Sequence, residues 1–327
     1  MPRKTDPLAG NDIAVIVIGR NEGARLIACL DAVQGAAARI IYVDSGSTDG
    51  SQDAARARQA EVVALDMTQP FTAARARNAG LARLSKKPDR VTFVQFIDGD
   101  CTLHPDWIET ARAFLVAHPD VVAVAGRLRE KHPDASVYNR LCDNEWNTPV
   151  GKARACGGIA MMRLAPVLLA GGFKDDLIAG EEPELCVRLR KQGWQIWRLD
   201  AEMALHDAAL TRFGQWWQRT RRGGYAFAEG VALHGAPPER HCVAPLRRII
   251  LWGLVLPAVT VLGALATPWA LLLLLAWPAQ VVRLRLRGMS WTAAFFMTLT
   301  KLPEAQGALT YWWRRMTRAR ARLIEYK

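Results

Sequence analysis

The sequence predicts an α/β protein with a mostly parallel sheet and helices on both faces, followed by a membrane-associated helical hairpin and a basic amphipathic helix. Short runs rich in β-branched residues alternate with helical stretches over the first 130 residues, which indicates a parallel sheet. Residues 249–282 contain no charged side chain. The net charge of +12 falls on the C-terminal third, because residues 1–206 hold 26 basic and 26 acidic residues.

Hydrophobic periodicity defines the elements of the first part. Apolar runs of four to seven residues indicate buried strands, and apolar residues at helical spacing, such as Leu26, Leu30 and Val33, indicate amphipathic helices. Pro105 suits the first turn of a helix. In chain order we expect strand 13–18, helix 22–33, strand 40–43, helix 50–60, helix 71–84, strand 91–97, helix 105–117 and strand 121–125.

The chain between residues 135 and 180 is less regular, and one more helix and strand follow it. Residues 183–192 are expected to form a helix, because Pro183 suits its first position and Gly193 suits its C-terminal stop. Residues 195–199 are expected to form the last strand of the sheet.

Polar loops follow three of the predicted strands. They are Gly19-Arg20-Asn21-Glu22, the loop that begins Asp44-Ser45-Gly46, and Asp98-Gly99-Asp100. Ligands of parallel sheets bind beyond the carboxyl ends of the strands, so these loops are the expected site. The two carboxylates around Gly99 suit a hard divalent cation, which takes oxygen ligands. An ordinary Asp-Gly turn is the simpler alternative.

Other polar residues have a functional and a structural interpretation. Asp44 is placed to accept hydrogen bonds from a nucleobase or ribose, or to cap the next helix. Arg77 is placed to meet a phosphate or base, or to belong to a solvated basic face. Glu181 and Glu182 precede Pro183, where a helix N-terminus stabilises a carboxylate that acts as a general base or as a cap.

The charge-free run predicts a membrane hairpin. A single helix over residues 249–282 would be ~51 Å long at 1.5 Å per residue, against ~30 Å of hydrocarbon. Thr267-Pro268 is the natural break, and basic residues on both flanks place both ends on the cytoplasmic side. The hairpin either crosses twice or re-enters, and a buried soluble hairpin is the alternative. The basic, aromatic segment 301–327 suits an interfacial helix.

Domain division and cysteine chemistry follow from the same patterns. We expect a catalytic domain over residues 1–240 and a membrane-associated region over residues 241–327. The six cysteines form no C-x-x-C pair and no close Cys/His cluster in the sequence. The sequence therefore predicts neither a zinc site nor a disulfide framework, and reduced thiols are expected.

An ordered set of motifs resembles glycosyltransferase family 2, the inverting group with the GT-A fold, in its membrane-associated bacterial type. The motifs are AVIVIGRNEGARL, IIYVDSGSTDGS, ARNAGL, FVQFIDGD and AGEEPELCVRLRKQGW, within residues 13–206. The resemblance implies a set of nucleotide-sugar-binding residues, which are Gly19, Arg20, Asn21, Glu22, Asp44, Ser45, Gly46, Arg77, Asp98 and Gly99.

The resemblance also implies a metal site and a catalytic base. Asp100, with Asp98 and His206, would hold Mg²⁺ or Mn²⁺. Glu182 stands where the family usually has the aspartate that deprotonates the acceptor hydroxyl, and Glu181 is its rival. Glutamate at this position departs from the family pattern and adds one methylene of reach.

The expected function is therefore metal-dependent transfer of a hexosyl-type sugar, with inversion, from a nucleotide-sugar donor to an acceptor hydroxyl. A lipid-linked or envelope glycan, such as an exopolysaccharide intermediate, is the expected acceptor. We expect the protein at the cytoplasmic face of the cell membrane, in contact with membrane lipids and without a nucleic-acid partner. The alternatives are a processive polysaccharide synthase and a basic nucleic-acid- or membrane-binding protein without catalysis, whose nucleic-acid form would show strongly salt-dependent binding.

Overall fold

The computed structural model describes residues 12–86 and 91–318, and these form two compact units. Unit 1 contains the described residues up to Leu177 together with Glu181–Thr211. Unit 2 contains Ile178–Gly180 and the described residues from Arg212 onward. The compact units therefore change at Arg212, while the functional boundary expected near residue 240 stays a proposal. The last part of the predicted interfacial segment, residues 319–327, lies outside the described residues.

Unit 1 contains a nine-stranded mixed sheet in the order β3-β2-β1-β4-β8-β6-β9-β5, with β7 paired to β9. The pairs among β1, β2, β3 and β4 are parallel, as the alternating pattern predicts. Pairs of β8 with β4 and β6 are antiparallel, and so are those of β9 with β5 and β7. The strands are β1 (Ile13–Gly19), β2 (Arg39–Asp44), β3 (Glu61–Ala64), β4 (Phe93–Asp98), β5 (Cys101–Leu103), β6 (Val121–Glu130), β7 (Gly151–Ala153), β8 (Ala160–Arg163) and β9 (Gln195–His206).

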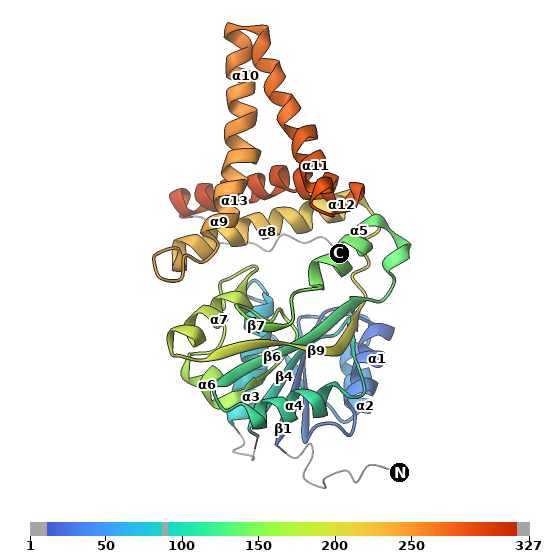
Figure 1. Cartoon of the computed structure of the whole chain (residues 1–327). Coiled ribbons are helices and arrows are strands. Elements are labelled where there is room, and N and C mark those ends of the chain that lie inside the picture. The colour runs from blue at the N-terminus through green and yellow to red at the C-terminus, as the bar shows by residue number, and fades with distance from the viewer. Residues whose placement is uncertain (1–11, 87–90, 319–327) are drawn as a thin grey trace. The chain divides into compact units, whose positions relative to one another are not determined.

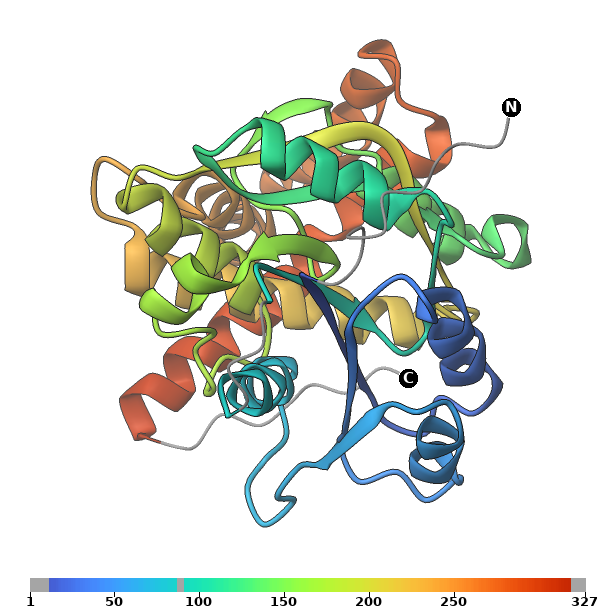
Figure 2. The same ribbon diagram turned by 90° about the horizontal axis from the view of Figure 1, so that it is seen from below.

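Helices cover both faces of this sheet. The helices of unit 1 are α1 (Ala24–Val33), α2 (Ser51–Ala57), α3 (Ala73–Ser85), α4 (Trp107–Ala117), α5 (Val137–Trp146), α6 (Leu164–Leu169) and α7 (Glu181–Lys191), with a short 3₁₀ turn at Pro133–Ala135. Alternate residues of β1 enter two separate cores, one shared with α1 and α4 and the other with α3 and α7. In Figure 2 the cyan α3 lies across the strands from the blue α1 and α2. Because both faces are buried, the central strands are mostly apolar, although β4 contains the buried Gln95.

Sequence periodicity locates the expected strands and helices, but it misses four strands, β3, β5, β7 and β8, and the helices α5 and α6, and it shortens two other strands. The edge strand β3 was not expected, because its four residues begin with Glu61 and are only partly buried. Strands β6 and β9 continue past their apolar segments. There Arg129 forms an ion pair with Glu202 across the two strands at 2.6 Å. Charged side chains that face solvent end an apolar run without ending a strand.

Unit 2 is entirely helical over its described residues from Arg212 onward. Its elements are α8 (Phe213–His234), α9 (Val243–Ile250), the π-helical turn η2 (Leu251–Val255), α10 (Leu256–Ala266), the 3₁₀ segment η3 (Pro268–Leu275), α11 (Ala276–Leu286), α12 (Trp291–Leu299) and α13 (Lys301–Thr317). Figure 1 shows α8 and α13 running side by side. The two helices can approach closely because Gly224 has no Cβ. A Cβ there would overlap the carbonyl oxygen of Glu304. A Cβ at Gly307 would likewise overlap the carbonyl oxygen of Arg221.

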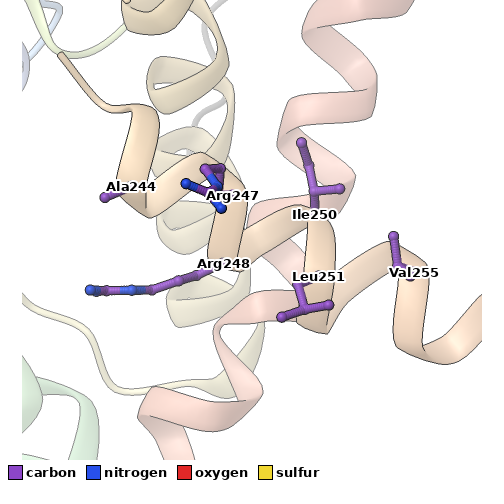
Figure 3. A pocket seen from close by; sticks show the side chains of 6 residues that line it. All are labelled: Ala244, Arg247, Arg248, Ile250, Leu251 and Val255. Carbon is purple, nitrogen blue, oxygen red and sulfur yellow. The ribbon is translucent and has the colours of Figure 1, made fainter. Parts of the chain in front are cut away.

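Two helical stretches of unit 2 are long and apolar enough to cross a membrane. Val243–Ala266 has a mean hydropathy of 2.3, with 17% of its most apolar window buried. Pro268–Leu286 has a mean hydropathy of 1.4, with none of that window buried. Figure 1 shows them as a hairpin whose turn coincides with the expected break at Thr267-Pro268. Near its start, Arg247 and Arg248 border a surface hollow of about 510 Å³ beside Leu251 and Val255 (Figure 3).

Candidate active site

The carboxyl ends of three neighbouring strands bring the predicted loops together. In the sheet register Gly19 of β1 pairs with Asp44 of β2, and Ile18 of β1 pairs with Asp98 of β4. The backbone N–H of Ser45 donates to the carbonyl of Gly19, and that of Gly99 donates to the carbonyl of Ile18. The sheet therefore places all three polar loops along one edge.

The loops after β1 and β2 hold one another. Asn21 has a left-handed backbone with φ of 56°, its N–H donates to Ser47 Oγ at 2.9 Å, and its side-chain oxygen accepts from Thr48 N–H at 2.8 Å. The guanidinium of Arg20 lies 4.9 Å from the centre of the Phe71 ring, within cation–π distance. Glu22 forms an ion pair with Arg25 at 2.7 Å. These contacts hold the two loops together at this edge of the sheet.

The carboxylate of Asp44 is fully buried and engaged on both oxygens. Oδ1 accepts from the Tyr42 hydroxyl at 2.9 Å, while Oδ2 accepts from the backbone N–H groups of Gly46 and Ser47 and from Gln52 Nε2. Burial raises the pKa of Asp44, but the hydrogen bonds from Ser47, Gln52 and Tyr42 outweigh it and lower the pKa below its ordinary value. In this structure the carboxylate orders the loop that Asp44 opens.

Arg77 of α3 is the electrostatic centre of the site. Its buried guanidinium donates to Glu181 Oε1 at 2.5 Å, to Asp98 Oδ1 at 3.0 Å and to the carbonyl of Gly158 at 3.3 Å. Burial lowers the pKa of Arg77, but Asp98 and Glu181 outweigh that effect and raise it. A guanidinium with several fixed donors can hold two carboxylates in place. Arg77 thus links the end of β4 to the start of α7.

Of the predicted metal residues Asp98, Asp100 and His206, the structure brings Asp100 and His206 together with Cys101, whereas the carboxylate of Asp98 binds Arg77. Asp100 Oδ2 lies 3.3 Å from His206 Nε2, because β5 and β9 pair Cys101 with His206. The imidazole of His206 stacks on Trp146 with ring centres 4.7 Å apart and planes 12° apart. Desolvation raises the pKa of Asp98, Arg77 opposes that shift, and Asp100 adds to it.

This group fits a hard or borderline divalent cation. Among the described residues, the buried Nδ1 of His206 has no hydrogen-bond partner, so the ring is held by stacking and by Asp100. Carboxylate oxygens and an imidazole nitrogen are ligands that Mg²⁺ or Mn²⁺ accepts. The donor types therefore agree with the expected metal.

Glu182 is more deeply buried than Glu181 and has different partners. Its carboxylate accepts from the backbone N–H groups of Cys156 and Gly157, both at 2.9 Å, and from the thiols of Cys156 and Cys186 at 3.0 and 2.7 Å. Burial raises the pKa of Glu182 above its ordinary value, although the hydrogen bonds from Cys156, Cys186 and Gly157 oppose this shift. Helix α7 begins at Glu181, so Pro183 is its third residue rather than its first.

Three contributors to this site were not identified from the sequence. Cys156 and Gly157 contact Glu182, and Trp146 stacks on His206, yet all three lie in the irregular stretch 135–180. The Gly157-Gly158 pair was the available signal. A Cβ at Gly158 would lie 2.8 Å from Arg77 Nη2, so a glycine there allows the loop to approach the guanidinium.

A family model and several known sequences match parts of the chain. Residues 14–158 match the model described as Glycosyl transferase family 2. The chain is 26% identical over 258 residues to the succinoglycan biosynthesis protein ExoA of Rhizobium meliloti (strain 1021), covering 74% of this chain and 77% of that protein. It is 26% identical over 260 residues to the pre-mycofactocin glycosyltransferase of Mycobacterium tuberculosis (strain ATCC 25618 / H37Rv), covering 75% of this chain. The match spans about half of that relative, or 52% of its length.

A solved structure shares the architecture. It is the mannosyltransferase PcManGT from Pyrobaculum calidifontis, determined in complex with GDP-Man and Mn²⁺. The TM-score is 0.63 at 19% sequence identity, and the alignment covers 95% of this chain and 89% of that chain. The likeness shows the fold, which is the GT-A fold expected from the sequence.

Proposed function

We propose that this chain belongs to glycosyltransferase family 2 and moves a sugar from a nucleotide-sugar donor to an acceptor hydroxyl with inversion at the anomeric carbon. The observation that carries the proposal is the convergence of two carboxylate groups around Arg77. Asp98 and Glu181 bind this arginine directly, although Glu181 lies 104 residues away from it along the chain. A donor diphosphate needs a positive charge nearby, and an attacking hydroxyl needs a carboxylate nearby. Both types of charge lie at this edge of the sheet.

The metal-binding residues of this proposal are Asp100, Asp98 and His206, the group described above. A Mg²⁺ or Mn²⁺ ion bound there would act as a Lewis acid that neutralises the leaving diphosphate. The protein itself fixes the carboxylates, because Arg77 binds Asp98 and the Trp146 ring supports His206. Arg77 also places a positive charge beside the expected diphosphate position.

Glu182 is the proposed general base, with Glu181 as its rival. The carboxylate of Glu182 takes the proton of the acceptor hydroxyl, the freed oxygen bonds to the anomeric carbon, and the bond from that carbon to the diphosphate breaks. Amide N–H groups of Cys156 and Gly157 hold the carboxylate in one orientation. A base with a raised pKa accepts a proton more readily near neutral pH. Glu181 is committed to Arg77, which suits a positioning role.

The proposed acceptor is a hexosyl-accepting glycan or lipid-linked intermediate at the cytoplasmic face of the membrane. The two apolar stretches of unit 2 support membrane association. One relative is named a succinoglycan biosynthesis protein, which supports a glycan acceptor. Arg247 and Arg248 at the start of the hairpin, and Arg283 after it, favour cytoplasmic ends. Membrane lipids are therefore proposed partners.

A ligand screen followed by a transfer assay tests the proposal. We expect UDP-, GDP- or dTDP-sugars with Mn²⁺ to stabilise the full chain by ~2.7 kcal/mol at a hundredfold excess over Kd, and excess EDTA to remove the stabilisation. The stabilising donor, radiolabelled in its sugar, should then label a lipid extract of the source membrane. If none of these nucleotide sugars stabilises the protein and no label is transferred, the proposed activity is wrong.

A further inference from the structure

Two thiols converge on the carboxylate of Glu182, the proposed general base. Cys156 Sγ lies 3.0 Å and Cys186 Sγ lies 2.7 Å from the same oxygen, Oε1 of Glu182. The two sulfur atoms are 4.0 Å apart. Glu182 and Cys186 are four residues apart on α7 and therefore lie on one side of the helix, while Cys156 reaches them from the loop before β8.

This spacing matches a tetrahedral metal centre. Zn²⁺ bonds to sulfur at about 2.3 Å and to carboxylate oxygen at about 2.0–2.2 Å, so two thiolates on one ion lie about 3.8 Å apart. The observed sulfur separation needs almost no change. The two sulfur–oxygen distances would widen, because the ion replaces the thiol protons that now bridge these atoms. The fourth position would remain open to water.

The surroundings of the three side chains also suit a bound ion. Glu182 and Cys186 are buried, and Cys156 is partly exposed. The N–H of Gly157 donates to Oε2 of Glu182 and orients the carboxylate. Hydrogen bonds of this kind around a ligand fix its geometry and strengthen metal binding. The site was not apparent in the sequence, since Cys156 and Cys186 are 30 residues apart.

The donor chemistry separates this group from the proposed catalytic metal site. Two thiols favour borderline or soft cations such as Zn²⁺, while the oxygen and imidazole donors of Asp98, Asp100 and His206 also serve hard ions such as Mg²⁺. Two thiols lie beside that second group: Cys101, whose Sγ is 3.5 Å from Asp100 Oδ1, and Cys29, whose Sγ is 3.7 Å from the carbonyl oxygen of Asp98. Cys101 can offer its sulfur to an ion beside Asp100 and His206, so it needs its own control.

We propose that Cys156, Glu182 and Cys186 form a second metal site, which takes a borderline divalent cation such as Zn²⁺ and withdraws Glu182 from proton transfer. Binding replaces two thiol protons, which are released to solvent, by two metal–sulfur bonds and one metal–oxygen bond. The inhibitory consequence rests on the proposed function of Glu182. The proposed binding of the metal does not depend on that function.

Co²⁺ binding tests the site without any assay of activity. The reduced, chelator-treated full chain should develop the near-ultraviolet thiolate-to-metal absorption band with one equivalent of Co²⁺, and Zn²⁺ should abolish the band. Binding should release two protons per ion, measured with a pH indicator in weak buffer. Absence of the band in the unmodified protein overturns the proposal, whatever any variant does.

Variants then locate the ion. Cys156→Ser and Cys186→Ser, on separate elements, should each weaken Zn²⁺ binding by about tenfold or more. Cys101→Ser and Cys242→Ser should keep both band and affinity, because Cys101 belongs to the other group and Cys242 to unit 2. Far-ultraviolet circular dichroism identifies any variant that fails to fold. A band that persists in both folded serine variants, or that disappears in Cys101→Ser alone, contradicts the assignment.

Inhibition is measured separately, with Mn²⁺ saturating. Zn²⁺ should inhibit sugar transfer by the unmodified enzyme, and Cys186→Ser should need about tenfold more Zn²⁺ for the same fractional loss. If the thiolate band forms but Zn²⁺ leaves transfer unchanged, the inhibitory part is wrong and the metal site stands. If no transfer is found with any donor, the proposed function fails while the Co²⁺ result still decides the site.

Discussion

Unit 1 and unit 2 contain the same apolar residue types but bury them very differently. In β1 the side chains from Ile13 to Val17 are at most 1% exposed, because helices cover the sheet on both faces. In η3 the residues from Leu271 to Leu275 are 39–60% exposed. An apolar run therefore does not by itself say what will cover it. Exposed apolar area of this extent marks a surface that another apolar phase covers.

Charge follows the same division. In unit 1 the buried Arg77 is paired with Asp98 and Glu181. The basic excess of the chain instead falls after residue 206, where 17 Lys and Arg stand against 5 Asp and Glu. Unit 1 holds the paired charges of the proposed active site, and unit 2 carries the basic excess that is proposed to face the membrane. If unit 1 carries the transfer activity and unit 2 holds the protein on the membrane, variants in unit 1 should leave membrane retention unchanged.

The largest expected effect is on membrane retention by unit 2. Val259→Arg with Leu262→Arg places two charges on the exposed face of a proposed membrane helix, at a cost of about 5–7 kcal/mol. We expect alkaline carbonate to release this variant while the unmodified chain stays in the pellet. The matched control is Val116→Arg with Leu169→Arg, because these unit 1 residues are similarly exposed, at 57% and 84%. Release of the control, or of the unmodified chain, contradicts the membrane hairpin.

The next effect is on the metal group of unit 1. Asp100→Asn removes a carboxylate ligand, and we expect transfer to fall by at least about a thousandfold, since Lewis-acid stabilisation is worth several kcal/mol. Isothermal calorimetry should show weaker binding of the nucleotide diphosphate in Mn²⁺. Carbonate resistance should not change. Full activity in excess EDTA would rule out the metal.

Glu182→Gln should reduce kcat by at least about a hundredfold, because glutamine keeps the shape but cannot take a proton. Donor affinity should stay nearly unchanged. Burial raises the pKa of Glu182, and the base acts only when deprotonated, so the rate should fall as pH drops through a value above the ordinary carboxyl range.

Glu181→Gln serves as the comparison for that variant. It should lose less activity and should keep the acidic limb of the pH–rate profile, because Glu181 acts through Arg77. The opposite ranking moves the base by one residue. If both variants keep their activity, the two glutamates only cap the start of α7 and neither is the general base.

The smallest effect is on the stability of unit 2. Gly224→Ala adds a Cβ that meets the backbone of Glu304, so α8 and α13 must separate, at a cost of about 1–3 kcal/mol. Gly223→Ala is the matched control, because its Cβ meets nothing within 4 Å and alanine favours a helix. Thermal unfolding in detergent should show a lower Tm for Gly224→Ala only. Equal Tm values would show that the helices tolerate the wider spacing.

The strands β1, β2 and β4 and the loops that follow them could be predicted from the sequence, for a local reason. Residues 13–18 and 93–97 are buried on both faces, so these segments are almost entirely apolar, and their ends are marked by Gly19 and Asp98. The break at Thr267-Pro268 is equally local, since proline lacks the N–H that continues a helix. Strand β3 was not predicted, because an edge strand needs no continuous apolar run.

The partners of each polar residue were decided only by the tertiary structure. The motif order alone indicated the family and the loops, but not that Arg77 would bind Glu181, 104 residues away. Nor did it indicate that Glu182 would bind the amides of Cys156 and Gly157, or that Trp146 would support His206. Periodicity reports which side of an element is buried, because that depends on neighbours a few residues apart. Which buried groups meet depends on sheet order and helix placement, and these bring together residues that the sequence separates.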